Sequence, residues 1–149
     1  MRLIVGANIV FSAILNSNGR IGDILINSGK RIDFIAPDFL RQEIFEHYTR
    51  LSKISGLTFE KLRETEFQIC SSITFISEEQ IKKSAWLFAH NLVHDVDLKD
   101  TPYVAFAKHF KCKLWSGDKK LMKGLSKKKF LDFITTDELY ELLENGGSK

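Results

Sequence analysis

The sequence predicts one α/β domain, a three-layer α/β/α sandwich whose central parallel sheet has about five strands. Short apolar runs alternate with helical stretches along the whole chain, and this alternation is typical of parallel strands joined by crossover helices. The length of 149 residues and the hydrophobic content of 44% are those of an ordinary globular domain with a sizeable core. We therefore expect a single domain over residues 1–145 and a disordered tail over residues 146–149.

The first half of the chain supplies three of the expected strands, each a short run rich in apolar residues, at residues 2–5, 33–36 and 73–76. Between them, apolar residues three to four apart predict helices at residues 8–15, 21–28, 37–52 and 58–70. The Gly29-Lys30 pair does not belong to a phosphate-binding loop, because the glycine required five positions earlier is replaced by Ile24.

The second half begins with Ser77 to Gln80, a pattern typical of a capping box, which predicts a long helix to about Leu92. Asp100-Thr101-Pro102 predicts the next helix start, since the aspartate can accept from first-turn amides and proline needs no donor there. Buried strands are expected at residues 112–115 and 131–135, and a terminal helix is expected to begin at Thr136.

Three aspartates stand where the chain is expected to meet the carboxyl edge of the sheet. Asp97 and Asp100 precede a helix, and Asp118 follows a strand. Ligands of open parallel sheets bind at this edge, and carboxylates are the ligands that Mg²⁺ and Mn²⁺ prefer. Two of them also have a simpler interpretation: Asp100 can serve only as a helix cap, and Asp118 only as a turn residue.

Basic residues follow directly after Asp118. A net charge of +3 does not by itself indicate nucleic-acid binding, but six lysines fall within eleven residues: Lys119, Lys120, Lys123, Lys127, Lys128 and Lys129. Such a surface beside an acidic pocket can bind the phosphates of a nucleic acid. The alternative is that the lysines form an ordinary solvated face, because phosphate binding needs cations that converge in space.

Two motifs carry a resemblance to a known family. The chain resembles the C-terminal half of a PIN domain at two motifs, D-x-x-D-T-P-Y-V-A-x-A at residues 97–107 and L-W-S-G-D-K-K-L at residues 114–121. The start of the chain and A-P-x-x-L-x-x-E-I at residues 36–44 also resemble that family, which comprises metal-dependent ribonucleases, including the toxins of VapBC-type toxin–antitoxin pairs.

The resemblance implies an acidic catalytic site that holds Mg²⁺ or Mn²⁺. Its implied catalytic residues and metal ligands are Glu43, Asp100 and Asp118, with Asp97 as an additional nearby ligand. Asn8 and Ser116 take supporting positions in the same motifs. The implied contacts to RNA are Lys119, Lys120, Lys127, Lys128 and Lys129.

One acid of the family pattern is absent. Where the family has Asp in L-I-V-D-A-N, this chain has Gly6, between matching residues on both sides. Glycine can offer a cation only its backbone carbonyl. We therefore expect an impaired endoribonuclease, inactive or attenuated in this chain. The sequence leaves open whether Gly6 is natural or an introduced inactivating substitution.

The alternative function is a non-catalytic PIN-like module that binds RNA or a protein. The resemblance implies an RNA substrate, a small antitoxin partner and a homodimer or higher assembly. A serine hydrolase is not indicated, because no Gly-x-Ser-x-Gly motif is present. The start shows no signal peptide and no apolar stretch reaches membrane-spanning length, so we expect a cytoplasmic protein without membrane contact.

Overall fold

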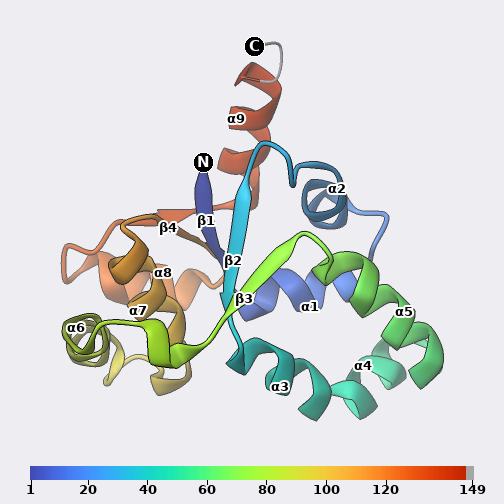
Figure 1. The fold of residues 1–149 in the computed structure, drawn as a ribbon, viewed down its shortest axis with the longest axis horizontal. Helices are drawn as coiled ribbons and strands as arrows, with labels where there is room; N and C mark the ends of the chain where they lie inside the picture. Colours follow the sequence, from blue (N-terminus) through green and yellow to red (C-terminus); the bar gives the residue numbers. More distant parts are fainter. Residues whose placement is uncertain (147–149) are drawn as a thin grey trace.

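A computed structural model describes residues 1–146, and it contains the expected central sheet with helices on both faces (Figure 1). The five strands follow the order β3-β2-β1-β4-β5, and every neighbouring pair is parallel. The first three strands run outward from β1 to β3 on one side of the sheet. The chain then crosses to the other side of β1 and adds β4 and β5, so the direction of strand addition reverses beside β1. Such a switch point opens a crevice at the carboxyl ends of the strands.

The elements alternate along the chain much as expected. The strands are β1 (Arg2–Val5), β2 (Asp33–Pro37), β3 (Ile73–Ile76), β4 (Lys113–Trp115) and β5 (Phe133–Ile134). The α-helices are α1 (Ala7–Leu15), α2 (Arg20–Asn27), α3 (Phe39–Glu46), α4 (Tyr48–Ser55), α5 (Phe59–Cys70), α6 (Lys83–Val93), α7 (Thr101–Phe110), α8 (Lys119–Ser126) and α9 (Thr136–Gly146). Two 3₁₀ turns are η1 (Glu78–Gln80) and η2 (Leu98–Asp100).

The sheet lies between two hydrophobic cores and is buried on both faces. Successive residues of a strand point to opposite sides, so Leu3 and Val5 pack in one core and Ile4 in the other. The first core includes residues of α1, α2 and α5, and the second includes residues of α6, α7 and α8. This double burial explains why the strands read as nearly continuous apolar runs.

The helix expected over residues 37–52 is two helices. α3 ends at Glu46 and α4 begins at Tyr48, with His47 between them at φ −100° and ψ 9°. The His47 ring lies 5.2 Å from the ring of Phe11, and its Nδ1 lies 2.7 Å from the carbonyl oxygen of Glu43. These contacts stabilise the break, and the apolar periodicity of the sequence does not reveal them.

The capping box expected at Ser77 is also wrong. Ser77 caps only the short turn η1, Ile81 is extended, and α6 begins later, at Lys83. Glu78 instead accepts a hydrogen bond of 2.9 Å from the backbone N–H of Phe39, in the first turn of α3. The carboxylate therefore satisfies a helix terminus 39 residues away in sequence, a pairing that a local motif cannot predict.

Two further differences concern the second half of the chain. The lysine-rich stretch after Asp118 forms α8, which the sequence did not predict, and β5 has two residues where five were expected. α9 extends through Gly146, and the remainder of the expected tail, residues 147–149, lies outside the described residues. Within residues 1–146, no helix has both the length and the apolar character needed to cross a bilayer.

Candidate active site

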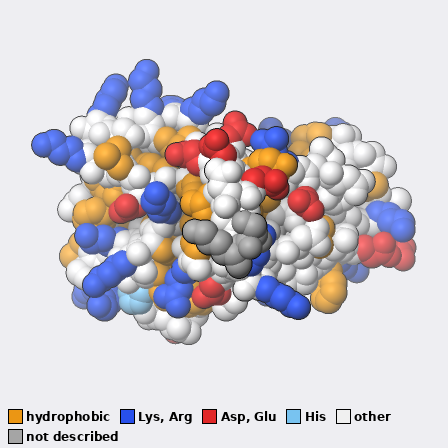
Figure 2. All heavy atoms as spheres, turned by 90° about the horizontal axis from the view of Figure 1, so that it is seen from above, with side chains coloured by type: hydrophobic (Ala, Val, Ile, Leu, Met, Phe, Trp, Pro, Cys, Tyr) orange, Lys and Arg blue, Asp and Glu red, His pale blue; other side chains and the backbone are white. Residues whose placement is uncertain are grey.

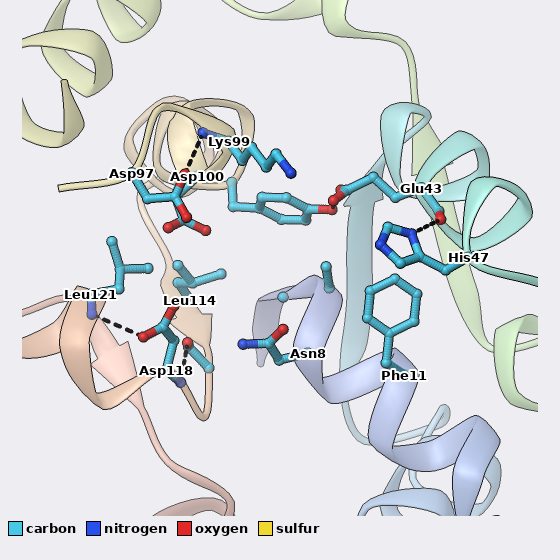
Figure 3. Close-up of a pocket in the computed structure, with 14 residues that line it drawn as sticks. Asn8, Phe11, Glu43, His47, Asp97, Lys99, Asp100, Leu114, Asp118 and Leu121 are labelled. Carbon is cyan, nitrogen blue, oxygen red and sulfur yellow. Dashed lines mark hydrogen bonds between the residues drawn. The ribbon is translucent and has the colours of Figure 1, made fainter. Parts of the chain in front are cut away.

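The acidic residues singled out from the sequence converge on one cavity of about 180 Å³. Glu43, Asp97, Asp100 and Asp118 all line it, together with Gly6, Asn8 and Ser116. The cavity lies where β1 and β4 end, and Figure 3 shows Asp97, Asp100 and Asp118 on one side with Glu43 on the other. The remaining lining residues are Ala7, Phe11, His47, Lys99, Tyr103, Leu114 and Leu121.

Asp100 is the least compensated of these carboxylates. It occupies the N-cap position of α7, but its side chain makes no capping hydrogen bond. Its Oδ2 is buried and has no hydrogen-bond partner within residues 1–146. Burial, followed by the charges of Asp97, Asp118 and Glu43, raises the pKa of Asp100 to about 7. The interpretation of Asp100 as only a helix cap is therefore wrong.

The other two aspartates of this side do cap backbone groups. Asp97 Oδ1 accepts from Lys99 N at 3.0 Å, and Asp118 Oδ1 accepts from Leu121 N at 3.0 Å. The cap at Asp118 starts α8, where it offsets the unfavourable placement of lysines at a helix N-terminus. The buried Ser116 holds this turn, because its Oγ accepts from Asp118 N at 3.0 Å. Within residues 1–146, the second carboxylate oxygen of Asp118 makes no hydrogen bond.

Glu43 reaches the cavity from α3 and is held by a partner on α7. The hydroxyl of Tyr103 donates to Glu43 Oε1 at 2.5 Å, and Tyr103 is only 3% exposed. Burial raises the pKa of Glu43, whereas the Tyr103 hydrogen bond and the charges of His47 and Lys99 act in the opposite direction. This carboxylate therefore has local compensation that Asp100 lacks.

Gly6 lies at the position of the absent acid and has an ordinary extended backbone. Its φ is −73° and its ψ is 155°, so the backbone admits a side chain there. A Cβ atom would lie 3.0 Å from the carbonyl oxygen of Trp115, which already accepts from the Gly6 N–H. An aspartate at this position requires a shift of a few tenths of an ångström in β4.

The candidate RNA-binding lysines fall into two groups at the two ends of one helix. Lys119 and Lys120 are exposed in the first turn of α8, next to Asp118, whereas Lys127, Lys128 and Lys129 follow the end of that helix. The helix of eight residues is about 12 Å long, so the two groups lie at its opposite ends. Lys128 is already engaged: its Nζ donates to the carbonyl oxygen of Leu92 at 2.7 Å and forms an ion pair with Asp95.

Basic side chains are also spread over the face at the amino edge of the sheet. Figure 2 shows them on both halves of that face, with more on the half where Figure 1 places α6 to α8. None of the five candidate RNA-binding lysines lines the acidic cavity. Any contribution of these lysines to RNA binding is therefore made outside the cavity.

The donor set of the cavity resembles an open cation site. The buried oxygen of Asp100 lacks a partner, and Asp118 has one uncapped oxygen. Mg²⁺ is commonly bound by one or two carboxylates while it keeps several waters, and this pair fits that arrangement. Within residues 1–146, no three His, Cys, Asp or Glu side chains are gathered closely enough to hold an ion, so a closed protein cage is not formed.

Sequence reasoning missed four residues of the cavity: Tyr103, Lys99, Phe11 and His47. Besides lining the cavity, His47 caps the end of α3 through its backbone N–H. Tyr103 is three positions after Asp100, which puts both on one face of α7. This spacing could have identified Tyr103 as a residue of the site.

Comparisons with known proteins identify the fold family. The family model described as the PIN domain matches residues 4–143. The chain belongs to the PIN domain family. Its structure is similar to a chain in the crystal structure of VapBC2 from Rickettsia felis bound to a DNA fragment from their promoter, with a TM-score of 0.63 and 14% identity. The similarity covers 91% of this chain and 97% of the other. No curated protein sequence matches this PIN domain.

Proposed function

We propose that this PIN domain is a metal-dependent endoribonuclease of the toxin type, impaired because Gly6 replaces an acidic ligand. The observation that supports it most directly is the partnerless buried oxygen of Asp100, beside Asp118 in the cavity. Burying a carboxylate oxygen without a partner is costly, and a cation at this position would remove that cost. Cation binding would then explain why Asp100 is placed there.

Within this proposal, the carboxylates have distinct roles. Asp100 and Asp118 bind the cation, and Asp97, which lines the same wall, adds negative charge. A bound Mg²⁺ or Mn²⁺ would supply an activated water and stabilise charge on a phosphate. Glu43 is oriented through Oε1 by Tyr103, which leaves Oε2 to accept a proton from water in the cavity. Asn8 and Ser116 support the site, Asn8 from the rim and Ser116 through the Asp118 turn.

The second candidate function is a PIN-like module that binds RNA or protein without cleavage. Two observations favour it: Gly6 supplies no carboxylate, and no three-residue ligand group is formed within residues 1–146. The two functions predict different results when an aspartate is introduced at position 6. A nuclease site regains metal binding and cleavage, whereas a binding module does not.

The deciding experiment replaces Gly6 with aspartate. Gly6→Asp should restore Mn²⁺ binding and cleavage of structured RNA, because it adds charge and an oxygen ligand beside Asp100 and Asp118. Gly6→Asn is the matched control, since it imposes the same contact with the Trp115 carbonyl without the charge. Mn²⁺ titration and an RNA cleavage assay measure the result. If Gly6→Asp folds but neither binds Mn²⁺ nor cleaves RNA, the nuclease proposal fails and the binding module replaces it.

RNA binding itself should depend on the lysines at both ends of α8. Each lost phosphate contact reduces the slope of log affinity against log salt by about 0.7 for single-stranded RNA. Lys127→Ala with Lys129→Ala should flatten this slope more than Lys128→Ala, because Lys128 is engaged with Leu92 and Asp95. The exposed Lys30, on the connection between α2 and β2, provides a control substitution. An unchanged slope would leave the lysines as a solvated face.

An antitoxin is the proposed protein partner. The similar structure from Rickettsia felis contains VapBC2, and an apolar groove of about 300 Å³ adjoins the acidic cavity here. The two hollows share Asn8, Phe11 and His47. A segment with apolar anchors and one basic side chain, placed among the acids, would fit both. A pull-down from the native host that recovers RNA but no small protein would contradict this proposal.

Self-association is proposed through apolar side chains on the projecting helices α3 to α5. Phe45 is 74% exposed and Phe67 is 79% exposed, and Ile54 and Phe59 are also exposed. Large exposed apolar side chains that cluster often mark interaction surfaces. Light scattering should therefore give a mass of at least twice the 17.1 kDa of one chain, and a monomer at micromolar concentration would exclude the dimer.

A further inference from the structure

His90 and His94 form a pair of exposed imidazoles at the C-terminal end of α6. Residues four apart lie on the same helix face, and the two rings are stacked with 5.9 Å between centroids and 22° between planes. Neither histidine lines the acidic cavity or the apolar groove beside it. The pair is therefore separate from the nuclease site proposed above.

The backbone selects the tautomer of His94. Its Nδ1 lies 3.1 Å from the carbonyl oxygen of Asn91, and because a carbonyl oxygen can only accept, Nδ1 carries the proton. Nε2 then keeps its lone pair and faces away from the backbone contact. Metal-binding histidines are typically oriented in this way, with one ring nitrogen donating to a carbonyl and the other binding the ion.

The end of α6 also favours cations electrostatically. A helix C-terminus carries partial negative charge, and the backbone N–H of His94 still bonds to His90 O in the last turn. Lys128 already uses this end of the helix, where its Nζ donates to Leu92 O and pairs with Asp95. Since Asp95 offsets the charge of Lys128, the ammonium group does not by itself exclude a second cation at the imidazoles.

We propose that His90 and His94 form a bidentate site for a borderline transition-metal ion of the Zn²⁺ type. An imidazole nitrogen binds Zn²⁺ at about 2.0–2.1 Å, so a small rotation of the side chains lets one ion reach both rings across 5.9 Å. Imidazole suits Zn²⁺, Cu²⁺ and Ni²⁺, whereas carboxylates suit Mg²⁺ and Mn²⁺. The imidazole pair therefore favours Zn²⁺ over Mg²⁺, and water fills the remaining positions on the Zn²⁺.

Calorimetric titration of the metal-free chain with ZnCl₂ tests the site. The unchanged chain should bind one equivalent at the pair, and His90→Gln or His94→Gln should weaken that binding at least about 10-fold, because chelation by two linked ligands becomes binding to one. His109→Gln is the matched control, since it removes one imidazole from α7. Asp100→Asn with Asp118→Asn should leave the binding unchanged.

A second measurement identifies the residues directly. The imidazole proton resonances of His90 and His94 should shift together on addition of Zn²⁺ and stay fixed on addition of Mg²⁺. Zn²⁺ should also raise the melting temperature of the unchanged chain but not of His94→Gln, because a ligand that binds only the folded state stabilises it. Equal Zn²⁺ affinity in the unchanged chain and His94→Gln, or loss of binding in the Asp100 and Asp118 variant, would overturn the assignment.

Discussion

The two sides of the acidic cavity hold carboxylates in different states. On the side of α7 and α8, one oxygen of Asp100 is buried without a hydrogen-bond partner among residues 1–146, and its neighbours Asp97 and Asp118 are also acidic. Across the cavity, Glu43 is likewise half-buried, but Tyr103 donates to it and Lys99 and His47 offset its charge. The difference lies in local compensation: Tyr103, His47 and Lys99 offset the charge of Glu43, whereas the charges beside Asp100 are all acidic.

The largest expected effect concerns metal affinity in the Gly6→Asp background. Asp100→Asn should weaken Mn²⁺ binding by more than about 100-fold, because replacing even an indirect supporting residue of a metal site costs about 10- to 100-fold. Glu43→Gln should cost less, since Tyr103 already satisfies one oxygen of Glu43. Calorimetric titration with Mn²⁺ measures both. The comparison breaks if Glu43→Gln weakens binding more than Asp100→Asn.

The second effect concerns folding stability in the presence of a chelator. The pKa of Asp100 is raised to about 7 in the folded chain, so the folded state holds a proton that the unfolded state has released between about pH 4 and pH 7. Stability must therefore fall as pH rises through this range and stay lowered above it. Asp100→Asn should raise the free energy of unfolding at pH 8 by about 1–2 kcal/mol, after a discount for solvent screening of the partly exposed group.

Urea denaturation at pH 4 and pH 8 separates this electrostatic gain from a packing effect. The gain from Asp100→Asn should disappear at pH 4, where the carboxyl group is protonated in the folded state. Asp132→Asn is the control, because Asp132 is exposed and lies outside the cavity. A gain of the same size at both pH values would mean that charge repulsion is not its cause.

The smallest effect tests the compensated side. Tyr103→Phe removes the hydroxyl that donates to Glu43, and it should lower the free energy of unfolding by about 1 kcal/mol at pH 8, since a hydrogen bond to a buried charge is lost. The loss should be smaller at pH 4, because the pKa of Glu43 is already raised and would rise further without this donor. Urea denaturation of Tyr103→Phe and of Tyr140→Phe, a tyrosine on α9 away from the cavity, measures it. Equal losses of unfolding free energy in the two variants would mean that the Tyr103 hydroxyl does not stabilise Glu43.

The sequence by itself determined the fold class and predicted which acidic residues line one cavity. Alternation of apolar runs and helical stretches predicts a parallel sheet because strands buried on both faces admit few polar residues. The chain also places Asp97, Asp100 and Asp118 next to helix starts or strand ends, and the carboxyl ends of parallel strands meet at one edge. The convergence of these residues with Glu43 on one cavity follows from that geometry.

Only the tertiary structure decided how each acid is satisfied. From the sequence, Asp100 was expected at a helix start and Asp118 in a turn. In the structure, the side chain of Asp118 caps α8, whereas that of Asp100 makes no capping hydrogen bond. Glu78 looks like part of its own capping box and instead caps α3, while Glu43 is held by Tyr103, 60 residues away. Such pairings depend on which elements the fold brings together, because a hydrogen bond requires two groups within about 3 Å. Sequence spacing fixes that distance only within one element.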